Sequence, residues 1–241
     1  MTGRLLTFPL GIGCTSIEPL SGPRTVTSGI ESVDGFVQSV ASPNDFWRFR
    51  FSLPPLRGEA FRKYRGWVTA MHGGANASRW SFFDPDRFSL AEGGALYSEN
   101  QIISGVSWSN GQPWSNGQNW KASHQKVPVA AALALSATEV VLADEFWGYG
   151  LDVGDYIGFF PFHFGLYMIT EVKSQPGRYR IWPPLRKAVS SDSFATLDPV
   201  LVMRLEGDAA APVARSLAVA DSLTITMVEV RDYDVRDYFT G

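Results

Sequence analysis

The stretch that decides the fold is Phe46-Trp-Arg-Phe-Arg-Phe-Ser-Leu53, in which aromatic or apolar residues alternate with mostly polar ones. A period of two places the two sets on opposite faces of an extended chain, so the segment predicts a β-strand with one buried aromatic face. Pro54-Pro55 ends this strand, because proline has no N–H to donate to a neighbouring strand. Residues 35–40 are predicted to pair with it across the turn Ser42-Pro-Asn-Asp45.

Residues 59–72 change to a helical spacing. Apolar side chains recur there at steps of three and four residues, which is one stripe of an amphipathic helix: Ala60, Phe61, Tyr64, Trp67, Val68 and Met71. His72-Gly73-Gly74 is typical of a helix end, since glycine accepts the left-handed conformation found there. A helix with so large an apolar face must lie on a sheet.

Short strands form two groups along the chain. The second group is predicted at 126–130, 139–143, 155–160, 165–172 and 178–182, a regular spacing that suits a small barrel. Strands over 198–206 and 222–230 are assigned to the first group. The fold is therefore predicted to be mainly β: a β-sandwich domain of residues 1–105 and 199–241 with one flanking helix, a connecting loop at 106–120, and an inserted small β-barrel domain at 121–198.

Composition excludes several classes of protein. The 241 residues are 45% hydrophobic and 19% charged, which is ordinary for a globular protein. Acidic residues outnumber basic ones by 24 to 21, so direct nucleic-acid binding is not expected. No stretch approaches the roughly 18 apolar residues of a membrane span. The single Cys14 excludes an internal disulfide, and the first 14 residues are interpreted as an opening strand rather than as a lipoprotein signal.

Motifs for catalysis are missing from the sequence. The histidines at 72, 124 and 163 lack metal-ligand spacing, and there is no phosphate-binding loop or nucleophile elbow. Asp152 and Asp155, with Asp144 and Glu145 nearby, could surround a cation or form a carboxylate pair, but Asp152-Val-Gly-Asp155 fits a turn before a strand better. Those at 232, 234 and 237 do not have the spacing of a calcium loop. We expect a protein that is not an enzyme, with no metal site and no cofactor.

A short tandem repeat lies in the connecting loop. Trp108-Ser-Asn-Gly-Gln-Pro is followed by Trp114-Ser-Asn-Gly-Gln-Asn and then by Trp120. Each Asn-Gly pair favours a tight turn with positive φ. The candidate subunit-interface or glycan-contact residues are Trp108, Trp114, Trp120, Tyr233, Tyr238 and Phe239. Two interpretations stay open, because aromatic residues anchor protein interfaces and tryptophans with amides also suit sugar rings.

Several motifs in one order resemble a known group of proteins. Phe49-Arg-Phe-Ser-Leu-Pro-Pro-Leu-Arg57, the helix with its central Trp67, and the exit Gly73-Gly74-Ala-Asn76 are similar to tail-tip proteins of long-tailed bacteriophages. The Trp-Ser-Asn-Gly-Gln loop and the segment from Asp152-Val-Gly-Asp155 through Trp182-Pro-Pro-Leu-Arg186 resemble the middle region of the same group.

The resemblance implies a distal tail protein or a related minor tail protein of a siphophage-like virus, made in the host cytoplasm and located in the virion. Proteins of that group use a tail-tube-like β-sandwich to form rings, usually hexamers, that join the tail tube to the hub or baseplate around the tail channel. The expected partners are thus further copies of the chain, the tail tube protein and hub proteins. A hub subunit remains open, as does a carbohydrate-binding accessory module.

Overall fold

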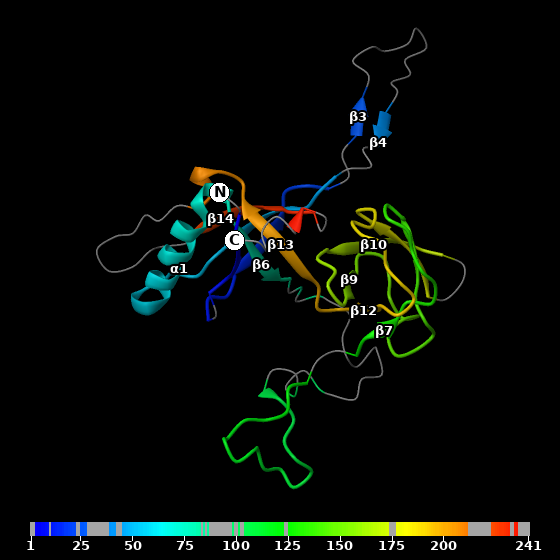
Figure 1. Cartoon of the computed structure of the whole chain (residues 1–241), viewed down its shortest axis with the longest axis horizontal. Coiled ribbons are helices and arrows are strands. Elements are labelled where there is room, and N and C mark those ends of the chain that lie inside the picture. Colours follow the sequence, from blue (N-terminus) through cyan, green and yellow to red (C-terminus); the bar gives the residue numbers. More distant parts are fainter. Residues whose placement is uncertain are drawn as a thin grey trace. The chain divides into compact units, whose positions relative to one another are not determined.

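A computed structural model describes residues 3–9, 11–22, 25–27, 39–41, 45–82, 84, 86, 98, 101, 104–122, 125–173, 177–211, 223–231 and 234–235. Contacts divide the chain into two compact units (Figure 1). The first unit joins Met1–Ser81 to Val200–Gly241, and the second is the continuous segment Phe82–Pro199. The regular structure of the described residues is mainly β, as predicted.

The first unit is built on a six-stranded sheet with the order β1-β6-β13-β14-β5-β2. Its strands are β1 (Leu5–Thr7), β2 (Ser16–Pro19), β5 (Arg48–Ser52), β6 (Ala77–Ser81), β13 (Val200–Leu205) and β14 (Thr224–Glu229). β1 and β6 are parallel, and the other neighbouring strands are antiparallel. A separate antiparallel pair consists of β3 (Thr25–Thr27) and β4 (Ser39–Ala41), both labelled in Figure 1.

The strand predicted at 46–53 is confirmed as β5. Phe49 and Phe51 are buried, whereas Arg50 between them is exposed, so the alternation sorts the side chains as expected. Each phenylalanine lies opposite a buried residue of β14, Met227 or Ile225. The aromatic face of β5 is therefore part of the core of the first unit.

The predicted pairing of residues 35–40 with this strand is wrong for the described residues of that range, 39 and 40, while 35–38 lie outside the described residues. β5 pairs with β14 on one edge and with β2 on the other, and a strand has only two edges for backbone hydrogen bonds. Residues 39–41 instead form β4, which pairs with β3. The true partner, β2, has the sequence Ser-Ile-Glu-Pro with one large apolar side chain, too weak a pattern to predict a strand.

The helix predicted at 59–72 is confirmed as α1 (Gly58–Met71). Its buried side chains are four of the six in the predicted stripe, Phe61, Tyr64, Trp67 and Met71, and the other two, Ala60 and Val68, are partly buried. The indole Nε1 of Trp67 donates a hydrogen bond of 3.2 Å to the hydroxyl of Ser78 on β6, which attaches the helix to the sheet. The helix ends at His72, a left-handed residue with a φ of 45°.

The turn after α1 approaches β13 closely. It contains the 3-10 helix η1 (His72–Gly74), and a second short one, η2 (Asp208–Ala210), follows β13. Gly74 has a φ of +100°, and a Cβ atom there would lie 2.3 Å from the carbonyl oxygen of Leu205. Only glycine fits this position without moving the backbone of β13.

The second unit contains another six-stranded sheet, with the order β7-β12-β9-β10-β11-β8. Its strands are β7 (Val127–Pro128), β8 (Glu139–Val141), β9 (Tyr156–Phe160), β10 (Tyr167–Val172), β11 (Arg178–Trp182) and β12 (Phe194–Thr196). All neighbouring strands are antiparallel. Five of them fall in the predicted ranges, and β12 was not predicted.

This second sheet curls. Although β7 and β8 are at opposite ends of the strand order, the N–H of Ala143 donates to the Pro128 carbonyl at 2.9 Å, and the N–H of Ala130 donates to the Val141 carbonyl at the same distance. Aliphatic and aromatic side chains fill the inside of the curl, among them Val127, Val140, Ile157, Tyr167, Ile169 and Tyr179. The hydroxyl groups of both tyrosines form hydrogen bonds there. That of Tyr179 donates to the Gly148 carbonyl at 2.9 Å.

Candidate functional site

The tryptophan loop, residues 105–120, is closed at its base by two backbone hydrogen bonds. The N–H of Val106 donates to the Trp120 carbonyl at 2.8 Å, and the N–H of Trp120 donates to the Val106 carbonyl at 2.9 Å. Gly105 has a φ of +80°, and a Cβ atom there would lie 2.7 Å from both the Cβ of Asn119 and the Trp120 carbonyl oxygen. Glycine at this position lets the two ends of the loop meet.

The first copy of the repeat folds into a compact turn. The N–H of Trp108 donates to the Gln112 carbonyl at 3.0 Å, and the N–H of Gly111 donates to the Trp108 carbonyl at 2.8 Å. The side-chain Oδ1 of Asn110 accepts a hydrogen bond of 3.0 Å from the Gln112 N–H, and Gly111 has the expected positive φ of 78°.

The second copy repeats this turn bond for bond. Trp114 donates to Gln118 at 2.8 Å, Gly117 donates to Trp114 at 2.7 Å, and Asn116 Oδ1 accepts the Gln118 N–H at 3.0 Å. Gly117 has a φ of 77°. The two Asn-Gly turns predicted from the sequence are confirmed, and the chain presents the same structure twice, six residues apart.

The structure brings three of the predicted site residues together into one tryptophan cluster: Trp108, Trp114 and Trp120. Their ring centroids are separated by 5.1 Å, 5.7 Å and 4.8 Å, with the rings tilted or edge to face. This is the favoured geometry of aromatic pairs. The side chains are nevertheless 45%, 40% and 49% exposed. The remaining predicted site residues, Tyr233, Tyr238 and Phe239, lie outside the described residues.

A second exposed aromatic surface, the phenylalanine row, consists of Phe160, Phe162 and Phe194. Phe194 on β12 lies directly opposite Phe160 on β9, and on its other side it lies opposite Pro128 of β7. Side chains opposite one another in an antiparallel pair have Cβ atoms about 5 Å apart, so Phe160, Phe194 and Pro128 form a continuous strip. Phe162 follows two residues after Phe160 and is 81% exposed.

Two lysines accompany the phenylalanine row. The Nζ of Lys126 lies 3.4 Å from the centroid of the Phe160 ring, a cation–π contact. The Nζ of Lys187 donates a hydrogen bond of 2.7 Å to the Phe162 carbonyl. The strip is therefore apolar with cationic neighbours.

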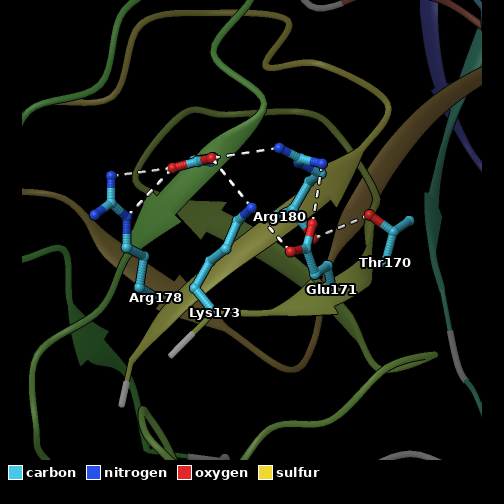
Figure 2. Close-up of polar contacts among 6 residues, drawn as sticks. Thr170, Glu171, Lys173, Arg178 and Arg180 are labelled. Atoms are coloured by element: carbon cyan, nitrogen blue, oxygen red, sulfur yellow. Dashed lines mark hydrogen bonds and ion pairs between the residues drawn. The ribbon is translucent and has the colours of Figure 1, made fainter. Parts of the chain in front are cut away.

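A polar counterpart, the ion-pair cluster, covers part of β8, β10 and β11 (Figure 2). It consists of Glu139, Glu171, Lys173, Arg178 and Arg180. The strand register explains it, because Arg180 lies opposite Glu139 on one neighbouring strand and opposite Glu171 on the other. Arg180 Nη1 is 3.0 Å from Glu171 Oε2, and Arg178 Nη2 is 3.1 Å from Glu139 Oε2.

The ion pairs of this cluster connect neighbouring strands of the sheet. A hydrogen bond from Lys173, 2.9 Å away, is the main reason why the pKa of Glu171 lies below its usual range, and the charge of Arg180 adds to the effect. Glu171 therefore stays ionised at neutral pH and does not have the raised pKa of a general acid.

Burial alters the pKa of two titratable side chains, His163 and Cys14. Burial, with a smaller contribution from the charge of Lys187, lowers the pKa of His163 to about 3, so its ring is neutral at pH 7. Burial raises the pKa of Cys14 to about 11, which keeps the thiol protonated. His72 is exposed at the end of α1, and His124 lies outside the described residues.

The acidic residues before β9 form a turn, as predicted. Asp155 Oδ2 accepts a hydrogen bond of 2.7 Å from the N–H of Asp152, and Asp152 Oδ1 accepts one of 2.7 Å from the N–H of Val153. No group of three or more His, Cys, Asp or Glu side chains in the described part of the chain is placed to hold a metal. Of the C-terminal acidic residues, those at 232 and 237 lie outside that part.

A cleft of about 470 Å³ lies in the first unit. Its lining includes two arginines and two carboxylates: Arg204, Arg231, Glu229 and Asp234. Glu229 is buried, and its Oε2 accepts a hydrogen bond of 2.9 Å from the backbone N–H of Trp47. This hydrogen bond connects β14 to the start of β5.

Comparison with models of known protein families finds no match, and neither does comparison with curated proteins. Among the described residues, no helix combines the length and the apolar character that crossing a bilayer requires.

Sequence reasoning missed the phenylalanine row and the ion-pair cluster. For the cluster a signal exists, since Glu171 and Lys173 are two residues apart, as are Arg178 and Arg180, so each pair shares a face of its strand. The row has no such signal, because Tyr156–Phe160 is a nearly continuous apolar run in which Phe159 is buried and Phe160 is exposed.

Proposed function

We propose that this chain is a structural subunit of the tail tip of a long-tailed bacteriophage. In this proposal its copies associate into a ring, a hexamer by analogy with the group it resembles, that joins the tail tube to the hub or baseplate. The support from the sequence is the order of motifs from the aromatic strand β5 through the Leu-Pro-Pro turn to α1. The chain acts in the virion and has no catalytic role.

The two units have separate parts in this proposal. We assign the first unit, with its six-stranded sheet and α1, to the ring-forming domain, which the resemblance implies is a tail-tube-like β-sandwich. We assign the curled sheet of the second unit to the inserted small β-barrel that the resemblance implies. An insertion of this kind suits a tail-tip protein, because it adds binding surface without interrupting the sheet of the ring-forming domain.

The observation that carries the assembly role is the distribution of exposed apolar side chains. Every large hydrophobic side chain that is exposed among the described residues belongs to the second unit. Exposed apolar patches on soluble proteins mark contact surfaces, and aromatic residues are the usual anchors of protein interfaces. The phenylalanine row, with Phe162 as its most exposed member, is the surface that we assign to a neighbouring subunit.

The test is the oligomeric state of the purified full-length chain. Analytical ultracentrifugation across a range of concentrations should show a discrete oligomer, and negative-stain microscopy should show rings. The double substitution Phe160→Ser with Phe162→Ser should shift the protein to monomers, because it removes the centre of the proposed contact. Arg62→Ser, on the exposed side of α1, serves as the control and should leave the oligomer intact.

One result would overturn the assembly role, and another would overturn the contact surface assigned to it. A wild-type chain that stays monomeric at every concentration, and does not co-purify with phage tails, cannot form the ring. An oligomer that is unaffected by the phenylalanine substitutions would show that the row is not the contact surface.

A further inference from the structure

The tryptophan loop differs in charge from the rest of the chain's surface. Residues 105–120 contain no Asp, Glu, Lys, Arg or His, although 19% of the whole chain is charged. Apart from the backbone, its polar groups are indole N–H groups, hydroxyls and side-chain amides. Phosphate groups of nucleic acids require cations, which this loop does not provide. Its chemistry instead matches a neutral ligand that both donates and accepts hydrogen bonds.

The amide groups of the loop are available to a ligand. Oδ1 of Asn110 and Oδ1 of Asn116 each accept a backbone N–H within their own turn, which fixes the orientation of these side chains. Within the part of the chain that the structure describes, their Nδ2 groups and the side-chain amides of Gln112 and Gln118 have no hydrogen bond to protein. All four residues are exposed, so these groups face solvent.

The tryptophan cluster supplies the apolar half of such a site. Trp108, Trp114 and Trp120 hold one another in place by ring contacts and still expose about half of each side chain. Their positions are therefore set before a ligand arrives, which lowers the entropic cost of binding. A pyranose ring has a face of C–H groups that packs on an aromatic ring, and a rim of hydroxyl groups that bonds to amides.

The repetition within the loop suggests the form of the ligand. Because the two turns are identical in sequence and in hydrogen bonding, the same tryptophan and amide groups occur twice in succession. A ligand built of identical units can engage both copies, and the second contact then adds to the first as an intramolecular event. We propose that the tryptophan loop binds a neutral polysaccharide, such as one at a cell surface. This site is independent of the proposed ring contact at the phenylalanine row.

The experiment uses the intact chain and defined glycans. Isothermal titration calorimetry with neutral oligosaccharides of one to six sugar units, drawn from glucan, mannan, xylan and chitin series, should show binding to at least one series. The affinity should rise by about tenfold or more from the shortest to the longest oligomer, because only the longer ones span both turns. Alginate oligomers, which carry a carboxylate on each unit, are the acidic controls and should not bind.

Variants assign the binding to the loop. Trp114→Ala should weaken binding by about tenfold or more, and Gln112→Glu, which places a charge in the neutral loop without removing an aromatic ring, should also weaken it. Tyr149→Ala is the matched control, since it removes a more exposed aromatic side chain that lies outside both the loop and the phenylalanine row, and it should leave glycan affinity unchanged. Thermal unfolding midpoints of all variants establish that they are folded.

Three results would overturn the proposal. One is the absence of binding to every neutral series at millimolar glycan concentrations. Another is binding that prefers alginate, and the third is binding that Trp114→Ala and Gln112→Glu leave unchanged. If Trp114→Ala alters the oligomeric state and no glycan binds, the cluster is a protein contact and not a sugar site.

Discussion

The hydroxyl oxygen of Tyr167 lies 2.7 Å from Nε2 of His163, inside the second unit. The same oxygen accepts a hydrogen bond of 3.0 Å from the backbone N–H of Arg186. With the imidazole proton on Nδ1, the tyrosine hydroxyl donates to Nε2 while it accepts from Arg186, so each group has a partner. Protonation of His163 would remove this acceptor and place a charge among buried groups.

Stability should therefore fall in mild acid. The pKa of His163 is about 3 in the folded chain and about 6.5 in an unfolded one, so the unfolded state binds a proton first as the pH falls. The stability from this group is complete above pH 6.5 and is lost progressively towards pH 3. Between these limits the free energy of unfolding should fall by about 1.4 kcal/mol per pH unit.

The dependence of the free energy of unfolding on pH can be measured by urea unfolding at several pH values between 5 and 7, where the protonation of carboxylates changes little. His163→Gln keeps an acceptor for Tyr167 but does not titrate, so its slope should be shallower by the contribution of one proton. Equal slopes for wild type and His163→Gln would refute the assignment.

Truncation of the buried stripe of α1 should destabilise the first unit. Met71→Ala should lower the free energy of unfolding by about 2–5 kcal/mol, because the side chain is fully buried and its removal leaves a cavity. Lys63→Ala removes only an exposed ion pair with Glu59 on the same helix and should change it by less than about 0.5 kcal/mol. Chemical unfolding followed by tryptophan fluorescence compares the two, and similar losses would contradict the assigned orientation of the helix.

The ion-pair cluster should make the stability of the second unit depend on salt. Glu139→Gln removes the carboxylate that bonds to Arg178 and lies near Lys173 and Arg180, and should cost about 1 kcal/mol or less at low salt. The difference from wild type should shrink at 1 M NaCl, because salt screens the lost attractions. Paired urea titrations at 50 mM and 1 M NaCl test this expectation, and a difference that is independent of salt would argue against it.

The base of the tryptophan loop should not tolerate a side chain at Gly105. Gly105→Ala puts a Cβ atom 2.7 Å from Asn119 and Trp120, so the closing hydrogen bonds should break and amide exchange over 106–120 should accelerate. Gly111→Ala has a similar positive φ but open space around the new atom, so it should affect only its own turn. Hydrogen–deuterium exchange with mass spectrometry separates a local effect from an opening of the whole loop.

Elements with strong local patterns could be predicted from the sequence. The alternation at 46–53 located β5, and the helical spacing at 59–72 located α1, because each pattern belongs to one type of backbone. β12 (Phe194–Thr196) and β2 were missed, since a strand of three or four residues offers too few alternations to recognise. The partner of β5 was predicted wrongly, because pairing depends on contacts distant in sequence.

The candidate sites, too, could be predicted only as far as they depend on local sequence. The Asn-Gly turns followed from local chemistry, but the mutual contact of Trp108, Trp114 and Trp120 depends on the three-dimensional path of the loop between them. The ion-pair cluster requires the register of β8, β10 and β11, which no single segment encodes. The sequence therefore showed which types of side chain were available for a site, but it did not show which of them contact one another in the fold.

The strand order of the first sheet has a consequence for biosynthesis. In that sheet β13 and β14 separate β6 from β5, yet both follow the whole segment Phe82–Pro199 along the chain. A nascent polypeptide that has reached Pro199 holds every residue of the second unit, while β5 and β6 still present open edges in the first. Until the ribosome delivers the last strands, those edges need protection from pairing with another molecule, whether by chaperones or by rapid translation.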